Sequence, residues 1–398
     1  MPSPQKVEEA NMREVAIIGV GLSQWGEIWG SSLRSLWTEA ALAALADAGI
    51  DRVDTITVGS MSPGLFVGQE HLGALLADEI GMAGVPATRV ESACASGGVS
   101  LKAAFAEVAS GLASIALATG VEKMTDVSGD ECTAALATAA DAELEVFHGA
   151  TFPGLYALMA RAHMERYGTT REQLAMVAVK NHKHGSLNPR AQYRQVITVN
   201  DVVRSARVAD PLNVLDCSPI TDGAAAVVLA EIGLARKLAK GRPVVRIAGI
   251  GHATDCIALH NRPDMTTIPA TTKAAERALA MAGKRPQDMH LVELHDCFTI
   301  AEIVVLESLG LCAPGEGGKQ AESGRTALGG ALPVNVSGGL KSKGHPVGAT
   351  GIAQIVELTT QLRGEAGKRQ VAGAKLGLAQ NMGGTGASTV VTVVEVAS

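Results

Sequence analysis

Cys94 and His345 lie in two short glycine-rich segments, each directly before a stretch with the apolar spacing of a helix. A thiol at a helix N-terminus meets the positive end of the helix dipole and free backbone N–H groups, and both favour the nucleophilic thiolate. An imidazole nearby can take the thiol proton. Taken singly, a packing cysteine and a turn histidine remain open alternatives. Their equivalent placement before two helices predicts one shared nucleophilic site.

A second group of titratable side chains comprises His295, Asp296 and Cys297. It directly follows the segment 289–294, which has the character of a strand. Folds of the α/β class place their sites at the carboxyl ends of strands. The spacing offers no second ligand pair of a usual type, so no metal site is predicted. A buried structural cysteine beside an exposed histidine is the alternative.

A third glycine-rich segment, Asn381 to Gly386, lies between two apolar runs near the C-terminus. Backbone N–H groups in such a turn can bind an oxyanion, although a tight hairpin has the same composition. Gly19 and Gly21 also end an apolar run. They lack a third glycine and a helix directly after them, so a dinucleotide site of the Rossmann type is rejected.

Composition narrows the classes of protein to consider. The chain has 398 residues, enough for two domains or one large two-part fold, and its 45 glycines indicate a core in which backbones approach closely. The net charge of −6 argues against nucleic-acid binding. The six cysteines contain no Cys-x-x-Cys pair, so reduced thiols are expected. No apolar stretch reaches membrane-spanning length and no secretory signal is visible, so we expect a cytoplasmic protein.

Two parts of the chain repeat one order of elements. Alternation of strand and helix predicts an α/β fold, and its repetition predicts two related halves. The predicted strand, helix and strand cover 15–20, 33–47 and 54–58 in the first part, and 244–250, 271–281 and 289–294 in the second. We assign 1–124 with 221–243 to the N-terminal half, 125–220 to an inserted loop domain, and 244–398 to the C-terminal half.

The inserted segment contains a local excess of basic residues. Residues 173–200 contain no Asp or Glu but include Lys183 and Arg190 among several basic side chains. In an acidic protein such a patch is suited to a phosphorylated ligand. A solvated helix face and loop is an equal alternative.

Together these segments resemble the thiolase superfamily, most closely its sterol-carrier-protein-2 type and archaeal and bacterial acetyl-CoA acetyltransferase relatives. The resemblance spans residues 15–396. Besides the Cys94 loop, it rests on the motifs YGTTREQLAMVAVKNHKHGSLNP (167–189), DCSPITDGAAA (216–226), HDCF (295–298) and GGLKSKGHPVGATG (338–351). It implies two βαβαβαββ halves forming a five-layered α-β-α-β-α core, a loop domain, and a tight homodimer or dimer of dimers.

The resemblance also implies roles for individual residues. Cys94 would accept the acyl group, His345 would activate it, and Cys297 would move the α-proton. His295 with His345 would form one oxyanion hole, and the backbone N–H groups of Cys94 and Gly383 would form the other. Other thiolases have a second cysteine where this chain has Asn381; in the sterol-carrier type that cysteine lies in the 295–298 segment.

Coenzyme A would bind as a substrate near Ser218 and the basic patch with Lys183 and Arg190. No metal or tightly bound cofactor is implied. The implied activity is that of an acyl-CoA thiolase: cleavage of a 3-oxoacyl-CoA by coenzyme A, or the reverse Claisen condensation.

Two alternatives stay open. One is a ketosynthase-like condensing enzyme that uses Cys94, His295 and His345. The other is a subunit of a thiolase or aldolase complex with a small zinc-ribbon/OB-fold partner of the DUF35 type.

Overall fold

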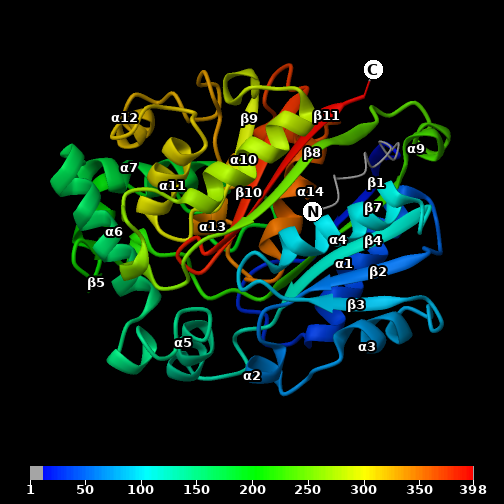
Figure 1. Ribbon diagram of the computed structural model, residues 1–398, viewed down its shortest axis with the longest axis horizontal. Helices are drawn as coiled ribbons and strands as arrows, with labels where there is room; N and C mark the ends of the chain where they lie inside the picture. Colours follow the sequence, from blue (N-terminus) through cyan, green and yellow to red (C-terminus); the bar gives the residue numbers. More distant parts are fainter. Residues whose placement is uncertain (1–11, 398) are drawn as a thin grey trace, which may run out of the picture.

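The computed structural model describes residues 12–397, and it contains two halves of like topology with an insertion between them (Figure 1). The N-terminal half consists of β1 (Val15–Leu22), α1 (Leu33–Ala48), β2 (Thr55–Gly59), α2 (Pro63–Val67), α3 (Leu72–Glu79), β3 (Ala87–Val90), α4 (Ser96–Ser110), β4 (Ile115–Glu122), β7 (Gly223–Glu231) and α9 (Ile232–Leu238). The C-terminal half consists of β8 (Val245–Thr254), α10 (Pro269–Ala282), β9 (Leu291–Leu294), α11 (Thr299–Ser308), α12 (Gly317–Glu322), α13 (Gly339–Ser342), α14 (Thr350–Leu362), β10 (Leu376–Gly383) and β11 (Ser388–Val396).

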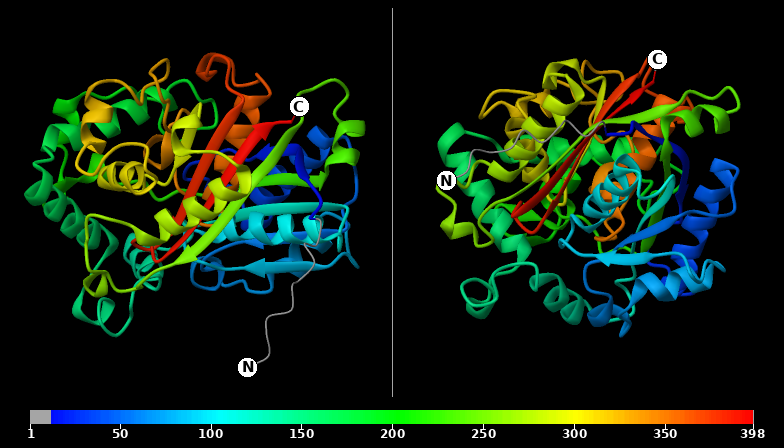
Figure 2. Two further views of the ribbon diagram at one scale, coloured as in Figure 1. Left: turned by 45° about the horizontal axis from the view of Figure 1, so that its top comes forward. Right: turned by 45° about the vertical axis from the view of Figure 1, so that its right-hand side comes forward.

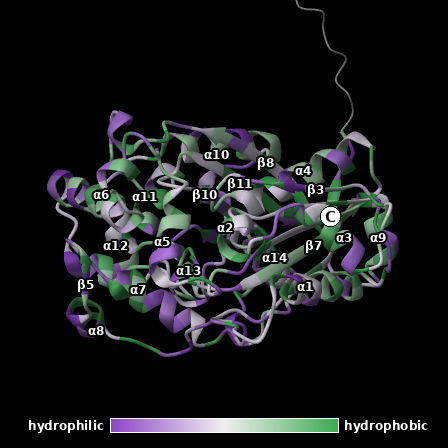
Figure 3. Ribbon diagram, turned by 90° about the horizontal axis from the view of Figure 1, so that it is seen from below, coloured by the Kyte–Doolittle hydropathy of each residue, from purple (hydrophilic) through white to green (hydrophobic). Residues whose placement is uncertain are grey.

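The insertion between β4 and β7 consists of α5 (Gly129–Ala137), α6 (Phe152–Tyr167), α7 (Arg171–Gly185), α8 (Val199–Arg204), β5 (Arg207–Ala209) and β6 (Leu212–Asn213). Hydrophilic segments lie along its outer side, near α6 and α8 (Figure 3). The boundaries of the loop domain predicted from the sequence, 125 and 220, fall between β4 and β7. The division into domains itself stays a prediction.

Nine strands form one sheet in the order β3-β2-β4-β7-β1-β8-β11-β10-β9. The two halves meet where β1 pairs antiparallel with β8. Outward from this junction each half repeats one order, with β8, β11, β10 and β9 in the places of β1, β7, β4 and β2. The counterpart of β3 is reduced to a single parallel bridge between Val292 and Val334.

The helices complete five layers. α4 and α14 pack against each other between the two parts of the sheet, α1 covers β1 and β7, and α10 covers β8 and β11 (Figure 2). Separate apolar clusters fill the outer layer of each half and the central layer. The predicted thiolase-like α/β fold is therefore confirmed. Among residues 12–397, no helix is long and apolar enough to span a membrane.

Two strands carry a Gly-x-Gly pair where an outer helix crosses. A Cβ at Gly19 or Gly21 of β1 would collide with backbone carbonyl oxygens of α1. Gly249 and Gly251 of β8 face α10 in the same way. Such close backbone approach requires residues without a side chain. The Gly19-x-Gly21 pair thus has a packing role that its sequence context alone did not show.

Candidate active site

Cys94 lies in the turn between β3 and α4, two residues before the helix begins. The preceding Ala93 has a left-handed backbone with φ 49°. Ser96 holds the turn, since its Oγ accepts from the Ser92 N–H at 2.9 Å and donates to the Ala93 carbonyl at 2.6 Å. Burial raises the pKa of the Cys94 thiol to about 12, and the opposing hydrogen bond from the Gly384 backbone N–H does not offset it. The expectation of a resting thiolate was wrong, because desolvation outweighs the helix terminus.

His345 lies in the loop before α14 and is 6% exposed. Its Nδ1 lies 2.7 Å from Thr350 Oγ1, whose own hydroxyl donates to the Pro346 carbonyl at 3.1 Å. Thr350 therefore accepts from His345, which assigns the ring proton to Nδ1 and leaves a lone pair on Nε2. Burial, with a further contribution from Lys343, lowers the pKa of His345 to about 3. The imidazole is neutral at pH 7 and free to accept a proton.

His295 completes a cluster with these two residues. Cys94 Sγ and one ring nitrogen from each of His295 and His345 all lie within 4.8 Å of one another. The two rings meet edge to face, with centroids 4.9 Å apart. Burial, with a smaller contribution from His345, lowers the pKa of His295 well below its usual range. Within residues 12–397, His295 Nε2 is buried without a hydrogen-bond partner.

Cys297 follows β9 and is buried beside this cluster. Burial raises the pKa of its thiol well above the usual range, although a hydrogen bond with Tyr156 acts in the opposite direction. Tyr156 donates its hydroxyl to the Gly384 carbonyl at 2.9 Å and stacks on Phe298. Cys297 is thus a protonated thiol at neutral pH, held among apolar rings.

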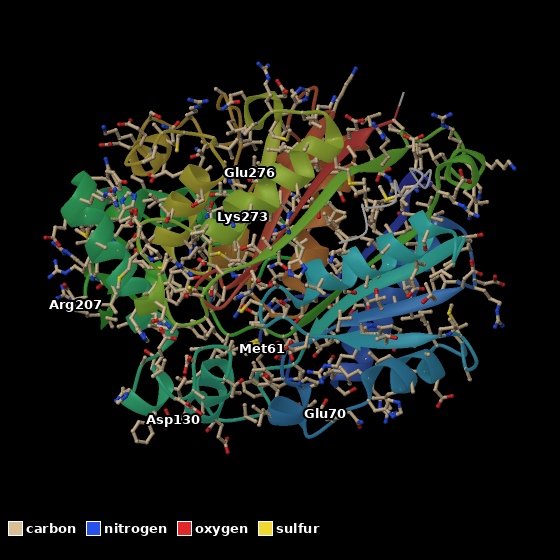
Figure 4. All side chains as sticks on the ribbon, in the orientation of Figure 1. Met61, Glu70, Asp130, Arg207, Lys273 and Glu276 are labelled. Carbon is tan, nitrogen blue, oxygen red and sulfur yellow. The ribbon has the colours of Figure 1, made fainter. Side chains whose placement is uncertain are left out.

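One cavity of about 380 Å³ opens onto these groups. Cys94, Cys297, His345, Gly384 and Ser218 line it. The rest of the lining is mostly apolar and comes largely from the insertion, and it includes Met124, Leu136, Phe152, Pro153, Tyr156, Val208, Ile220, Phe298 and Val347. Met61, labelled in Figure 4, belongs to a small apolar cluster that also packs against Cys94. The cavity therefore joins the Cys94 and Cys297 thiols to space for an apolar group.

Comparisons with known proteins agree with this geometry. Residues 15–232 match the family described as "Thiolase, N-terminal domain", and residues 251–396 match "Thiolase C-terminal domain-like". The chain belongs to the thiolase family. It is an acyltransferase of the thiolase type.

Relatives of this thiolase cover nearly all of the chain. It is 53% identical to an acetyl-CoA acetyltransferase of Methanothermobacter thermautotrophicus over 96% of this chain and 99% of that protein. It is 37% identical to sterol carrier protein 2 of Bos taurus over 95% of this chain and 72% of that protein. A solved structure named "Ltp2-ChsH2(DUF35) aldolase" superposes with a TM-score of 0.81 at 27% identity, covering 95% of this chain and 97% of that one.

The predicted basic patch does not form as one surface in this thiolase. Lys180 is buried and ion-paired with Glu302 at 2.9 Å, and His182 and His184 are buried as well. Lys183 is exposed on α7 and does not line the cavity. Arg190 is also outside the lining and forms an ion pair with Glu39 at 3.2 Å. Of the three residues predicted near coenzyme A, Ser218 alone reaches the cavity.

The glycine turn begins three residues later than predicted, at Gly384 rather than Asn381. β10 extends through Gly383, which pairs with Ser388 of β11, so Asn381 belongs to the strand. The backbone N–H that reaches the Cys94 sulfur is that of Gly384. The oxyanion role predicted for Gly383 is not tested by this contact and stays a prediction.

Sequence reasoning missed three residues that hold the site. Thr350 fixes the His345 ring, Tyr156 contacts Cys297, and Asn381 contacts both Cys94 and His295. Thr350 follows His345 by five residues at the start of a predicted helix, and this spacing was the one available signal. Tyr156 has no local motif. Asn381 was noted only as the residue in place of a cysteine.

A buried polar network supports the segment with His295 from behind. Asp296 accepts from the Leu340 N–H at 2.7 Å and from the Asn181 side chain at 2.6 Å. Burial, reinforced by the neighbouring Glu302, raises the pKa of Asp296 to about 6. Both carboxylate oxygens of Asp296 accept hydrogen bonds. The segment after β9, which contains His295 and Cys297, is therefore fixed by side-chain hydrogen bonds as well as by strand pairing.

Proposed function

We propose that this thiolase cleaves a 3-oxoacyl-CoA through an acyl-enzyme on Cys94, or forms one in the reverse direction. The observation that carries the proposal is the convergence of Cys94, His295 and His345 within 4.8 Å beside an apolar cavity. Cys297, a second thiol, lines the same cavity. Coenzyme A and acyl-CoA would be the substrates, and the position of Ser218 in the cavity lining supports a contact between Ser218 and coenzyme A. Contacts of Lys183 and Arg190 with coenzyme A phosphates remain part of the proposal.

Acyl transfer begins at the neutral thiol. His345 Nε2 takes the Cys94 proton as the sulfur attacks the 3-keto carbon, so no separate thiolate has to exist in the desolvated site. The keto oxygen becomes an oxyanion, which the backbone N–H groups of Cys94 and the Gly383–Gly384 turn stabilise. Both reactive groups rest uncharged and pass one proton between them.

Breakage of the bond between C2 and C3 leaves the acyl group on Cys94 and an enolate on the shorter acyl-CoA. The Nε2–H of His295, together with His345 Nε2 while it carries the Cys94 proton, would stabilise that enolate oxygen. The Cys297 thiol protonates the carbon, and the resulting thiolate takes a proton from incoming coenzyme A. Coenzyme A then attacks the Cys94 thioester, and His345 returns its proton to Cys94.

Intact-protein mass spectrometry after brief mixing with acetyl-CoA or acetoacetyl-CoA tests the nucleophile. We expect an acetyl adduct in the wild type that disappears in Cys94→Ala. The matched control is Cys217→Ala, because Cys217 lines the same cavity and should leave the adduct intact. An adduct that survives Cys94→Ala would refute the assignment.

Cys297→Ala separates thiolase chemistry from ketosynthase-like condensation. A thiolase needs this thiol to move the α-proton, so the variant should form the acetyl adduct yet lose turnover. A decarboxylating condensing enzyme generates its carbanion without that step. Turnover of a malonyl thioester by Cys297→Ala at the wild-type rate would favour the alternative.

Assembly with other chains is part of the proposal. β3 is the edge of the sheet in the described chain and offers a free strand edge to a second copy, which supports a homodimer or dimer of dimers. The similar structure named for an aldolase with a DUF35 component supports a small zinc-ribbon/OB-fold partner. Light scattering of the chain purified alone and with its co-expressed genomic neighbours distinguishes these assemblies. A monomer under both conditions would contradict them.

A further inference from the structure

Asn381 occupies an unusual place in the site. It lies in β10, is 2% exposed, and uses its one side-chain amide to touch three parts of the machinery. Its Oδ1 accepts from the Gly98 N–H of α4 at 3.1 Å. Its Nδ2 donates to the Cys94 carbonyl at 2.9 Å and lies 3.2 Å from Nδ1 of His295.

Two backbone groups decide which way this amide points. The Gly98 N–H can only donate, and the Cys94 carbonyl can only accept. A flipped amide would face N–H with N–H and oxygen with oxygen at these two contacts. The orientation is therefore fixed with Nδ2 toward Cys94 and His295.

The fixed amide determines the His295 tautomer. A neutral imidazole has one N–H and one lone pair, and burial keeps His295 neutral by lowering its pKa. Because Asn381 Nδ2 is a donor, His295 Nδ1 must present its lone pair. The ring proton is then on Nε2, the buried nitrogen without a partner among the described residues.

We propose that Asn381 is a positioning residue that holds His295 in the Nε2–H tautomer, so that this N–H faces the substrate as an oxyanion donor. This step rests on the proposed function for its catalytic meaning. The tautomer itself follows from the contacts and can be tested without turnover. His345 has the opposite tautomer, with its lone pair on Nε2, so the two rings divide the tasks of donor and base.

A second consequence concerns divalent metal ions. Cys94 Sγ and the ring nitrogens of His295 and His345 lie close enough to surround one ion. Zinc takes thiolate and imidazole ligands, but each nitrogen must offer a lone pair. An N–H at His295 Nε2 opposes such binding. The same amide therefore makes His295 a donor and weakens a three-ligand zinc site at the nucleophile.

Asn381→Asp replaces the hydrogen-bond donor that faces His295 Nδ1 with an acceptor of nearly the same shape. The carboxylate can accept from His295 Nδ1–H, as carboxylates do behind zinc-bound histidines. The proton should move from Nε2 to Nδ1. Long-range ¹H–¹⁵N spectra of ¹⁵N-histidine-labelled protein report the tautomer, with the His295 signals assigned by their loss in His295→Gln. Nδ1–H in the wild type, or Nε2–H retained in Asn381→Asp, would overturn the proposal.

Zinc titration gives an independent readout. We expect zinc to bind Asn381→Asp at least about tenfold more tightly than the wild type. The matched control is Asn188→Asp, another buried amide that donates to a backbone carbonyl, that of Ser337, at 2.8 Å. Asn188 lies outside the cavity lining, so its variant should bind zinc as the wild type does. Equal zinc affinity in wild type and Asn381→Asp would refute the metal argument.

Asn381→Ala controls for the repulsion that a carboxylate would add at the Cys94 carbonyl. Asn381→Ala removes the amide that donates to His295 Nδ1 and adds no charge. Both His295 tautomers should then appear, and zinc should bind with intermediate strength. Loss of one oxyanion donor lowers kcat by about 10²–10³-fold, and Asn381→Asp should show this fall with little change in KM. Asn381→Ala should show a smaller fall, because part of the His295 population keeps its Nε2–H. If Asn381→Asp does not fold, the alanine variant decides the question.

The outcomes separate the two proposals. A wild type with Nε2–H that fails to form a Cys94 adduct would refute the proposed function and leave the tautomer assignment standing. A normal adduct with unchanged kcat in both Asn381 variants would retain the proposed function and refute the positioning role.

Discussion

The two halves use the same strand order but build their catalytic loops differently. In the N-terminal half, β3 is a free edge strand, and the turn that follows it to Cys94 is partly exposed. In the C-terminal half the corresponding strand shrinks to one bridge at Val334, and the whole segment 332–350 is buried.

The difference shows what each loop needs. Cys94, the proposed nucleophile, lies in a loop that lines the cavity. His295 and His345, the proposed donor and base, are buried, which restricts their rings to one orientation. The two imidazoles come from different segments of the C-terminal half, the end of β9 and the loop before α14.

The buried loop contains His345, the proposed base, and removal of this imidazole should have the largest effect. His345→Gln is expected to lower kcat for acyl transfer by about 10²–10⁴-fold, because the Cys94 thiol then has no acceptor for its proton. Stopped-flow measurement of acyl-enzyme formation checks this. A fall of less than tenfold would assign the base to another group.

The stability of the N-terminal half should depend strongly on one buried carboxylate. Asp222 accepts from the Lys123 ammonium at 2.8 Å and from the backbone N–H groups of Met124 and Ile28. Asp222→Ala removes the buried charge partner of Lys123, which keeps the more exposed Asp126 at 2.6 Å, and leaves buried backbone N–H groups without their acceptor. We therefore expect a loss of about 3–5 kcal/mol in unfolding free energy by urea titration. The exposed pair of Arg285 and Asp288 provides the control, since Asp288→Ala should unfold near the wild-type midpoint. Equal midpoints for the two variants would contradict this role.

In the C-terminal half, a histidine of α7 makes hydrogen bonds in the region where the counterpart of β3 is missing. His184 contacts the Asn335 carbonyl through Nδ1 at 3.0 Å and accepts from the Leu328 N–H through Nε2 at 2.9 Å. Burial, together with Lys180, lowers the pKa of His184 to about 3. In the unfolded chain, His184 therefore binds a proton below about pH 6.5, whereas in the folded chain it stays neutral until the pH approaches 3. The free energy of unfolding falls as the pH decreases over this range.

Between pH 7 and pH 5 this histidine should account for about 2 kcal/mol of the loss in unfolding free energy. His184→Gln should remove that part of the difference, measured by urea unfolding at the two pH values. The same substitution at His260, which is exposed, should leave the difference as in the wild type. A larger pH dependence in His184→Gln would reverse the sign and refute the argument.

The smallest expected effect concerns the orientation of the base. Thr350→Val removes the acceptor for His345 Nδ1–H but keeps the shape of the side chain, so kcat should fall about tenfold with KM nearly unchanged. Thr360→Val is the control, because the Thr360 hydroxyl donates to the Val356 carbonyl of its own helix. Equal kcat values for the two variants would show that burial alone orients the ring.

Local sequence signals predicted much of the frame. Helix α1 ends at Ala48 and α10 ends at Ala282, each one residue after the predicted ends at 47 and 281. The motifs around Cys94, His295 and His345 were recognisable because glycines and strand ends mark them. The reduced strand at Val334 was not predictable, because its pairing depends on contacts from a distant helix.

Electrostatics were harder to predict than position. The sequence places Cys94 at a helix start, which favours a thiolate, but the desolvation that keeps the thiol neutral comes from segments far along the chain. Lys180 lies in a basic run and is nevertheless buried against Glu302. The hydrogen bonds of Asn381 can form only when the fold brings the start of α4 and the end of β9 next to it. In each case the deciding partner is remote in sequence.

The glycine pairs of β1 and β8 have a consequence for how this chain can vary. Where Gly19 and Gly249 face helix backbones, any side chain requires the helix to retreat from the sheet. The cavity wall has no such restriction, because much of it comes from side chains of the insertion. In a saturation mutagenesis library selected for expression, substitutions at the two glycine pairs should therefore be depleted, at equivalent positions of β1 and β8. Substitutions in the cavity wall should be tolerated more often, so the acyl-group preference can change while the helix–sheet packing of both halves is kept.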